Sequence, residues 1–295
     1  MRIAFLFNPH SGRGNRALTA TTAHHLLIAA GHSVVPVQAG PGLSPEVLTD
    51  ALCTSDVLVV AGGDGSVHHA VPTAIAAKVP IFHFPLGTEN LFAREFGMTR
   101  SAPALVRAID RMSVRTIDTA TLAGRAFVIM ASVGFDACVV ERVAAARVRG
   151  VTRLDYVRCA MQELIDFRVA RLSITVDGKR EISSREGLVV VANSPQYAAR
   201  LNPVRVAKID DGQIDVLFLP FSTRAGLAAW MLSILAGSHT THPRAFSARA
   251  QTVEITSECG PSPLQLDGES TAGLTPSEMV KLQVVPMSLR VLIPV

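Results

Sequence analysis

The sequence predicts two domains: an α/β domain with a parallel sheet over residues 1–118, and a C-terminal β-rich sandwich domain over residues 119–295. Three observations predict this. The chain has 295 residues, 48% of them hydrophobic, which is enough for two cores. Short apolar runs alternate with helix-like stretches in the first part, and strand follows strand in the second.

The first domain shows the alternation typical of a parallel sheet that is covered on both faces. Apolar runs rich in β-branched and aromatic residues predict strands at 2–7, 33–37, 56–60 and 80–84. Helical spacing predicts helices at 16–30, 46–53 and 67–77. Sheets of this kind bind ligands beyond the carboxyl ends of their strands.

The second domain contains a run of strands that is interrupted by two helical regions. The strands are expected at 116–122, 126–132, 172–176, 187–192, 214–219, 252–257, 280–285 and 288–293. The helical regions are 137–167 and 223–236. Hairpin punctuation such as the Asp-Gly-Lys turn at 177–179 favours an antiparallel sandwich or barrel.

The composition limits the partners and the compartment. Lys and Arg number 28 against 24 acidic residues, a net charge of +4, so we expect no nucleic-acid partner. The chain opens directly into a strand and shows no signal-peptide pattern. The four cysteines have no zinc-site spacing, and we expect reduced, mostly buried thiols in a cytoplasmic protein: Cys53, Cys138, Cys159 and Cys259.

The longest apolar stretch, residues 225–237, is too short to cross a bilayer as a helix. We expect a core helix there, with a helix that touches a membrane surface as the alternative. No internal repeat or low-complexity tract is present.

Glycine-containing turns follow three of the predicted strands: NPHSGRG at 8–14, GGDGS at 62–66 and PLGTEN at 85–90. Glycines let backbone N–H groups approach a ligand, and the helix that follows adds partial positive charge, so each turn suits phosphate oxygens. Asp64 would be an odd negative group among amides that bind anions, which indicates a Mg²⁺ ion between it and the phosphates. Ordinary turn chemistry is the alternative for each turn.

Two other nucleotide fingerprints fit poorly. GRGNRA at 12–17 matches G-x-G-x-x-A, but four residues separate it from the strand, and the second strand ends without an acidic residue for a ribose. The G-x-x-x-x-G-K-[ST] pattern of the P-loop is absent from the sequence.

Taken in order, NPHSG, GGDGS, PLGTEN-LFARE, SVGFDA, KIDDGQIDV and LQLDGES resemble the bacterial lipid kinases of the diacylglycerol kinase catalytic-domain family, which includes sphingosine and ceramide kinases. The resemblance covers nearly the whole chain. It implies an NAD kinase/diacylglycerol kinase-like α/β domain and a β-rich lipid-substrate domain. The implied reaction is ATP-dependent phosphorylation of a diacylglycerol-like or sphingoid-like lipid hydroxyl.

The resemblance also implies residue roles. Asp64 would serve a phosphate-bound Mg²⁺, and Glu269 would be the general base for the lipid hydroxyl with Asp267 in support. The side chain of Asp211 and the carbonyls of Lys208 and Gln213 would hold a second, structural Mg²⁺. ATP would contact Asn8, Pro9, His10, Ser11, Gly12, Gly62, Gly63, Asp64, Gly65, Ser66, Val67, His68, Thr88 and Asn90. Surface turns are the alternative at 208–213 and 267–269.

Several positions depart from the family pattern. The family pattern GGDGT-x-N-E is replaced here by GGDGS followed by Val67, His68 and His69. The family pattern GT-x-N-D ends here in Leu91 instead of the aspartate. Gln38 replaces a common threonine and Arg13 an expected lysine. Ser66 stands in place of the family's threonine and keeps the hydroxyl group that would contact phosphate. We interpret these changes as a different lipid rather than a weakened site, because Asp64, Thr88, Asn90, Asp267 and Glu269 remain.

Two interpretations are open for several histidines and arginines. His68–His69 and His239–His242 could be metal ligands, but they lack nearby acids, which favours helix-surface or loop histidines. Five arginines form either a solvated helix face or a contact with anionic headgroups: Arg142, Arg147, Arg149, Arg153 and Arg158. The partners expected are therefore a lipid substrate and peripheral contact with the inner membrane face, with a homodimer left open.

Two alternatives to a lipid kinase remain. One is a kinase of a soluble substrate such as NAD, built on the same nucleotide domain. The other is a catalytically degenerate protein that binds nucleotide or lipid, which Leu91 and the His68–His69 replacement motivate.

Overall fold

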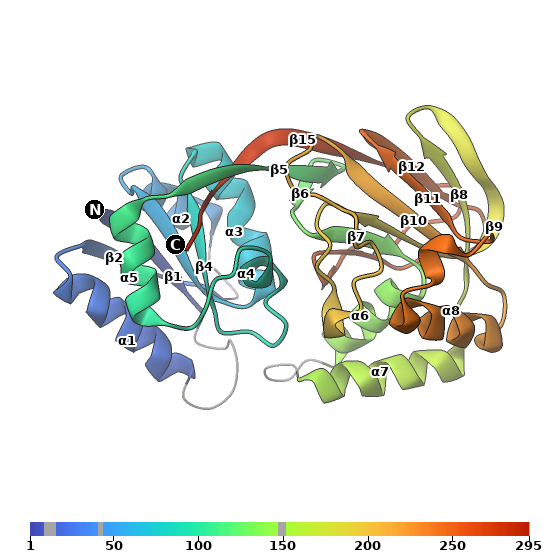
Figure 1. The fold of residues 1–295 in the computed structure, drawn as a ribbon, viewed down its shortest axis with the longest axis horizontal. Coiled ribbons are helices and arrows are strands. Elements are labelled where there is room, and N and C mark those ends of the chain that lie inside the picture. Colours follow the sequence, from blue (N-terminus) through green and yellow to red (C-terminus); the bar gives the residue numbers. More distant parts are fainter. Residues whose placement is uncertain (9–15, 41–43, 147–151, 295) are drawn as a thin grey trace. The chain divides into compact units, whose positions relative to one another are not determined.

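The computed structural model describes residues 1–8, 16–40, 44–146 and 152–294. The chain forms two compact units, which are treated separately below (Figure 1). The first unit is Met1–Ile117 with Met287–Val295, and the second is Asp118–Pro286. The sequence assigned all of 119–295 to the second domain. The end of the chain returns to the first unit because Val291 pairs with Ile81 in a parallel bridge.

The first unit is built on a parallel sheet, as predicted, and its strand order is β4-β3-β1-β2. The central strand β3 is buried at every position, which explains its uninterrupted apolar sequence. Helix α1 packs with α5, and α2 packs with α3. The strands are β1 (Arg2–Phe7), β2 (Ser33–Gln38), β3 (Val57–Gly62) and β4 (Ile81–Pro85). The helices are α1 (Arg16–Ala29), α2 (Pro45–Leu52), α3 (Asp64–Ala77), α4 (Leu91–Glu95) and α5 (Ala102–Arg111).

The second unit is an antiparallel sandwich, which confirms the predicted fold class. Its strands are β6 (Arg125–Phe127), β7 (Met130–Val133), β8 (Ala170–Val176), β9 (Lys179–Ala192), β10 (Ile214–Pro220), β11 (Phe246–Ala250), β12 (Thr252–Ser257), β13 (Leu264–Leu266) and β14 (Glu269–Ser270). Two long strands, β5 (Val114–Leu122) and β15 (Met279–Leu292), have residues in both units. The helices are α6 (Phe135–Ala145), α7 (Arg153–Asp166), α8 (Arg224–Ala236), η1 (Ala198–Arg200) and η2 (His239–Thr241).

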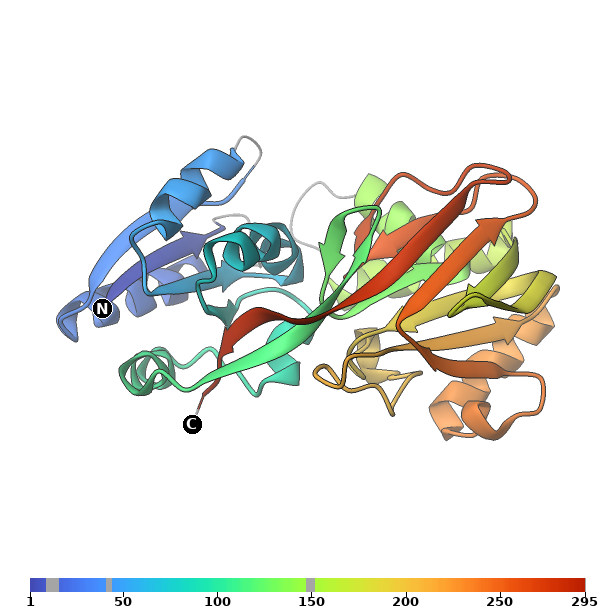
Figure 2. The ribbon, with the colours of Figure 1, turned by 90° about the horizontal axis from the view of Figure 1, so that it is seen from above.

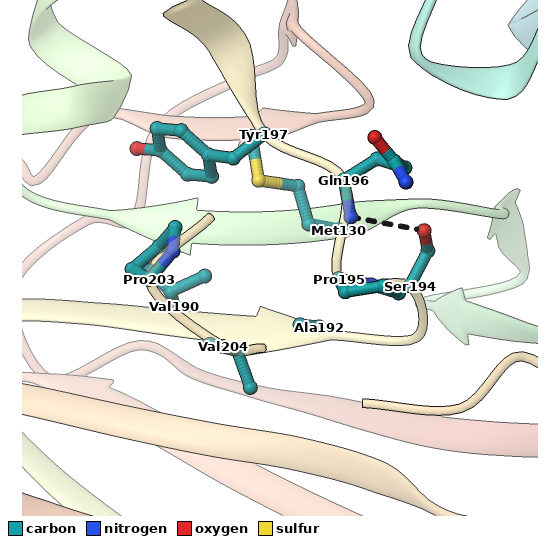
Figure 3. Close-up of a pocket in the computed structure, with 9 residues that line it drawn as sticks. All are labelled: Met130, Val190, Ala192, Ser194, Pro195, Gln196, Tyr197, Pro203 and Val204. Carbon is teal, nitrogen blue, oxygen red and sulfur yellow. Dashed lines mark hydrogen bonds between the residues drawn. The ribbon is translucent and has the colours of Figure 1, made fainter. Parts of the chain in front are cut away.

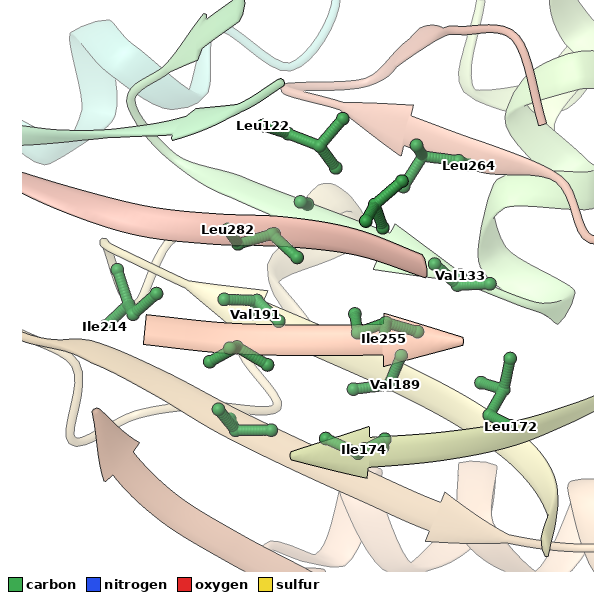
Figure 4. Close-up of a cluster of buried hydrophobic side chains, with 14 of the residues drawn as sticks. Leu122, Val133, Leu172, Ile174, Val189, Val191, Ile214, Ile255, Leu264 and Leu282 are labelled. Atoms are coloured by element: carbon green, nitrogen blue, oxygen red, sulfur yellow. The ribbon is translucent and has the colours of Figure 1, made fainter. Parts of the chain in front are cut away.

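The core of the second unit consists of aliphatic side chains contributed by many strands. Leu172 and Val189 lie opposite Leu264 and Leu282 in one buried cluster, all of them nearly inaccessible to solvent (Figure 4). Figure 2 shows the strands of this unit from a second direction. All four cysteines are free, as expected, but only Cys138 and Cys159 are buried.

The element boundaries differ from the predictions in informative places. The expected strand 126–132 is divided into β6 and β7, and the expected helix 137–167 is divided into α6 and α7. The strands expected at 280–285 and 288–293 are one continuous strand, β15. The sequence patterns do not predict α4 and α5.

Candidate functional site

The GGDGS turn is shorter than the sequence suggested, because helix α3 begins at Asp64 rather than at Val67. Gly63 is the N-cap residue, and its carbonyl accepts the N–H groups of Ser66 and Val67 at 3.0 and 3.3 Å. The first-turn N–H groups of a helix have no acceptor within the helix and carry partial positive charge. The start of α3 at the end of β3 is therefore suited to an anion such as a phosphate.

The GGDGS and PLGTEN turns touch through their glycines. A Cβ on Gly87 would lie 2.7 Å from the Cα of Gly63, and a Cβ on Gly63 would lie 3.3 Å from the Cα of Gly87. The contact at Gly87 is too short for a side chain unless the backbone shifts, and the one at Gly63 leaves little room, so glycine at Gly87 lets the backbones of the two turns meet. The sequence did not predict this contact between the two turns.

Asp64 connects the same two turns. Its Oδ1 accepts the backbone N–H of Phe92, in the first turn of α4, at 3.2 Å. Asn90 precedes α4 in the left-handed conformation, and its side chain closes its own turn: Oδ1 accepts the Gly87 N–H at 2.8 Å, and Nδ2 donates to the Gly87 carbonyl at 3.0 Å. The predicted ATP contact at Asn90 is thus also a structural element of the turn.

Asn8, the first residue of the NPHSGRG motif, contacts the GGDGS turn. Its Nδ2 donates to the Ser66 hydroxyl at 3.3 Å. Its backbone N–H donates to the Ala61 carbonyl at 3.1 Å. Thr88 is half-buried in the PLGTEN turn. The predicted contacts at Pro9, His10, Ser11 and Gly12 lie outside the described residues.

Val67 and His68 are buried, so a ligand at the start of α3 would meet their backbone rather than their side chains. The rings of His68 and His69 pack edge to face, with centroids 5.5 Å apart. His239 is buried, and its Nε2 lies 2.6 Å from the Pro203 carbonyl oxygen. Within the described residues, no three His, Cys, Asp or Glu side chains gather as metal ligands would. His68 and His239 are thus buried rather than at the surface, where the sequence placed them.

Two residues that the motif analysis missed support the glycine turns. The guanidinium of Arg100 donates to the carbonyls of Pro85 and Gly87 at 2.7 and 3.1 Å. His83 is fully buried under the end of β3, with Nε2 3.0 Å from the Gly62 carbonyl oxygen. Burial lowers the pKa of His83 to about 4, so the ring is neutral at physiological pH. Neither residue lies in a motif, and no sequence signal could have found them.

In the second unit, Asp267 and Gly268 form a two-residue hairpin turn between β13 and β14. Both have positive φ, +51° and +83°, as the Asp-Gly sequence favours. The Asp267 carboxylate is buried and accepts the backbone N–H groups of Val128, Ile129 and Met130 at 2.7 to 3.2 Å. Asp267 therefore anchors the turn to the segment between β6 and β7.

Gln265, which the sequence reasoning also missed, holds the other side of this turn. It is completely buried, and its Oε1 accepts the Gly268 N–H at 2.7 Å. Its Nε2 donates to the Ser132 hydroxyl at 2.8 Å and to the Asp136 carboxylate at 3.2 Å. The half-buried Glu269 directly follows the turn that these hydrogen bonds hold in place.

The network continues to Tyr197, which lines a small hollow beside Met130. Burial and the adjacent Asp136 carboxylate raise the pKa of Tyr197 well above its ordinary value, so the phenol stays protonated. The hollow offers no enclosed space for even a water molecule, so it does not enclose a lipid. Its lining is mostly apolar (Figure 3): Met130, Val190, Ala192, Ser194, Pro195, Gln196, Tyr197, Pro203 and Val204.

The segment predicted to hold a structural Mg²⁺ contains an ion pair in this structure. Asp211 pairs with Arg249, and its Oδ1 accepts the Gln213 N–H at 3.2 Å. Burial raises the pKa of the nearby Asp215, while Arg249 acts in the opposite direction. The Mg²⁺ site at Asp211, Lys208 and Gln213 stays a prediction, and a metal ion there would have to compete with the Arg249 guanidinium.

The arginines divide into paired and exposed ones. Arg142 binds the carboxylates of Glu163 and Asp166, so it belongs to an ion-pair cluster between α6 and α7 rather than to a free cationic face. Arg158 is exposed. The predicted contacts at Arg147 and Arg149 lie outside the described residues, as does the side chain of Arg153.

Comparison with known proteins identifies the architecture. Residues 2–122 match the diacylglycerol kinase catalytic domain, and residues 129–293 match the YegS C-terminal NAD kinase beta sandwich-like domain. The chain belongs to this family of bacterial lipid kinases. The resemblance seen in the sequence motifs is therefore confirmed, and membership supports an enzyme that transfers phosphoryl groups.

Curated relatives of this lipid kinase family member cover nearly its whole length. A diacylglycerol kinase of Mycobacterium tuberculosis is 29% identical over 302 residues, with 99% of this chain and 95% of the relative covered. A probable lipid kinase YegS-like of Pseudomonas aeruginosa is 26% identical, with 86% and 82% covered.

Solved structures show the same fold. A putative diacylglycerol kinase from Bacillus anthracis has a TM-score of 0.76 at 19% identity, covering 99% of this chain and 97% of that one. Yeast NADH kinase complexed with NADH has a TM-score of 0.57 at 12% identity, covering 100% and 84%. In the part of the chain that is described, no helix is both long and apolar enough to span a bilayer.

Proposed function

We propose that this kinase transfers the terminal phosphoryl group of ATP to a hydroxyl group of a diacylglycerol-like or sphingoid-like lipid. The observation that carries the proposal is the direct contact of the GGDGS and PLGTEN backbones at Gly63 and Gly87, next to the N-terminus of α3. This contact keeps the PLGTEN turn beside the first-turn N–H groups of α3, and such N–H groups suit the phosphates of a nucleotide.

The residues around this contact fit ATP with Mg²⁺. Asn8, Ser66 and Thr88 offer polar side chains beside the first turn of α3. Mg²⁺ is usually held by one or two carboxylates together with substrate phosphates, so a single carboxylate at Asp64 suits it without a dedicated protein cage. When bound, the ion would neutralise charge on the transferring phosphate. Asp64 also holds the backbone of Phe92, which keeps α4 beside the first turn of α3.

On the second unit, Glu269 is proposed as the general base. In this reaction the lipid oxygen forms a bond to the terminal phosphorus, the bond from that phosphorus to ADP breaks, and the hydroxyl proton passes to the Glu269 carboxylate. The turn that carries Glu269 is fixed by Asp267 and Gln265, which favours a defined position for the base. Asp267 supports Glu269 through the backbone by holding the turn.

The test is transfer of label from γ-³²P-ATP in the presence of Mg²⁺ and a total lipid extract, followed by organic extraction. We expect label in the organic phase from the wild type and none above background from Glu269→Gln, which should still bind ATP. Glu181→Gln is the matched control, because it makes the same change at another half-buried carboxylate, which pairs with the exposed Lys179.

The other results would assign different functions. Label in NADP and none in lipid would favour the soluble-substrate kinase. ATP binding without transfer to any acceptor would favour the degenerate binding protein. Turnover retained in Glu269→Gln would remove Glu269 from the role of base.

A further inference from the structure

One side of helix α7 exposes a row of large apolar side chains. Leu154, Val157, Met161 and Ile165 follow each other at helical spacing and are 74, 57, 56 and 68% exposed. The opposite side packs on α6 through the completely buried Glu163. A surface helix normally turns its apolar stripe toward the core, so a stripe that faces solvent indicates a binding surface.

Helix α8 also exposes an apolar side. Its inner side is buried around Trp230, whereas every exposed residue after Arg224 is Ala or Leu. Leu232 and Leu235 are 68 and 65% exposed. The sequence left a core helix and a membrane-touching helix open for this segment, and the structure shows a helix whose inner side alone belongs to the core.

One arginine side chain links the two helices. The guanidinium of Arg224, at the start of α8, donates to the carbonyls of Leu164 and Ile165 at the end of α7, at 2.9 and 2.5 Å. It also lies 5.2 Å from the centre of the Phe167 ring. Both helices are on the same side of the strands of the second unit (Figure 1). We define the apolar helix face as Leu154, Val157, Met161, Ile165, Leu232 and Leu235.

The charges around this face favour an anionic partner. Glu163 and Asp166 are paired with Arg142, and Glu163 is also paired with Arg168. The exposed Arg158 follows Leu154 by one helical turn and therefore borders the stripe. Helix α8 contains no acidic residue. Exposed Leu, Met and Ile side chains with arginine beside them are typical of helices that lie in the headgroup region of a bilayer.

We propose that the apolar helix face docks on the surface of an anionic lipid bilayer, with its six side chains inserted among the lipids and Arg158 at the headgroups. Docking gives the enzyme access to an acceptor that stays in the membrane, and in this respect it rests on the proposed function. Helix α7 has 14 residues and α8 has 13, so each would lie along the surface rather than cross it.

The test is co-sedimentation of the full chain with vesicles of phosphatidylcholine containing phosphatidylglycerol. The triple variant Val157→Ser, Met161→Ser and Leu232→Ser should bind at least about tenfold more weakly, because each serine removes most of a buried aliphatic side chain. The control variant Leu18→Ser, Ile28→Ser and Val47→Ser makes the same type of change at exposed aliphatic residues of the first unit and should bind like the wild type.

Unchanged binding of the triple variant, or no binding of the wild type, would overturn the proposal. So would a wild-type dimer, seen by sedimentation velocity, that the triple variant dissociates while vesicle binding stays the same, because the face would then join two copies. Salt adds a second criterion: the wild type should bind several-fold more weakly at 1 M than at 0.1 M salt, and vesicles of phosphatidylcholine alone should bind it less.

Transfer to a short-chain, water-soluble diacylglycerol separates this proposal from the proposed function. Equal transfer by the wild type and the triple variant, with a loss confined to vesicle-bound acceptor, would support both. Vesicle binding through the apolar helix face without transfer to any acceptor would leave the docking surface in place and remove the lipid kinase activity.

Discussion

The Asp267 carboxylate allows a quantitative test of how the catalytic turn is held. Its oxygens accept three consecutive backbone N–H groups, and the residue is 7% exposed. Asparagine tolerates the left-handed conformation found there, so Asp267→Asn removes the charge with little backbone strain. A hydrogen bond to a charged group contributes about 1 kcal/mol more than a neutral one, so three such bonds predict a loss of roughly 3 kcal/mol in the free energy of unfolding.

Urea unfolding followed by the fluorescence of Trp230 measures this loss. Trp230 is the only tryptophan of the chain, and it is buried in the second unit. Asp177→Asn is the matched control, because Asp177 also has positive φ and accepts the N–H groups of Gln251 and Thr252, but at the surface. The control should lose less than about 1 kcal/mol. Equal losses in the two variants would refute the view that burial makes the Asp267 contacts important.

Three further outcomes are expected. Gln265→Ala removes the acceptor of the Gly268 N–H, so kcat should fall roughly tenfold or more while the KM for ATP stays unchanged. Steady-state kinetics measures both constants, and an unchanged kcat would contradict a positioning role for Gln265. Gly87→Ala should weaken ATP binding in calorimetry by at least about tenfold, because the new Cβ would lie 2.7 Å from the Gly63 Cα, whereas Gly40→Ala, which meets no atom within 4 Å, should leave it unchanged. His83 has a folded-state pKa of about 4 and an unfolded value of 6.5, so the unfolded state binds the proton first and the free energy of unfolding should fall by up to roughly 3 kcal/mol as the pH drops from 6.5 to 4. His83→Gln should flatten this part of the profile in thermal unfolding, and an equally steep profile would contradict the assignment.

Local sequence patterns predicted the parts of the fold that local forces decide. The apolar run of β3 and the glycines after it predict a buried parallel strand that ends in a turn, and the structure has both. The sequence predicted the start of α3 at Val67 instead of Asp64, because Gly65 and Ser66 have low helix propensity and suggest a longer loop. A helix start at Asp64 overrides this preference and brings first-turn N–H groups to the end of β3.

The remaining errors come from contacts between residues that are distant in sequence. Residues 126–132 look like one strand, but the N–H groups of Val128 and Ile129 turn away from the ladder to the Asp267 carboxylate, 139 and 138 residues later. Pro286 and the positive φ of Met287 are typical of a strand end, yet β15 continues through them. Neither outcome can be inferred from hydrophobic periodicity, which reports burial along a segment and not its partners.

The two aspartates that the motifs single out illustrate a general difficulty in assigning roles from sequence. Asp64 was predicted to serve Mg²⁺ and Asp267 to support the base, but each carboxylate also binds backbone N–H groups of a distant segment, at Phe92 and at Val128–Met130. Replacing either residue would therefore displace a second loop as well as remove a charge, and loss of activity alone could not separate the two effects. The Glu269→Gln variant leaves Asp267 and Gln265, which hold the turn, unchanged.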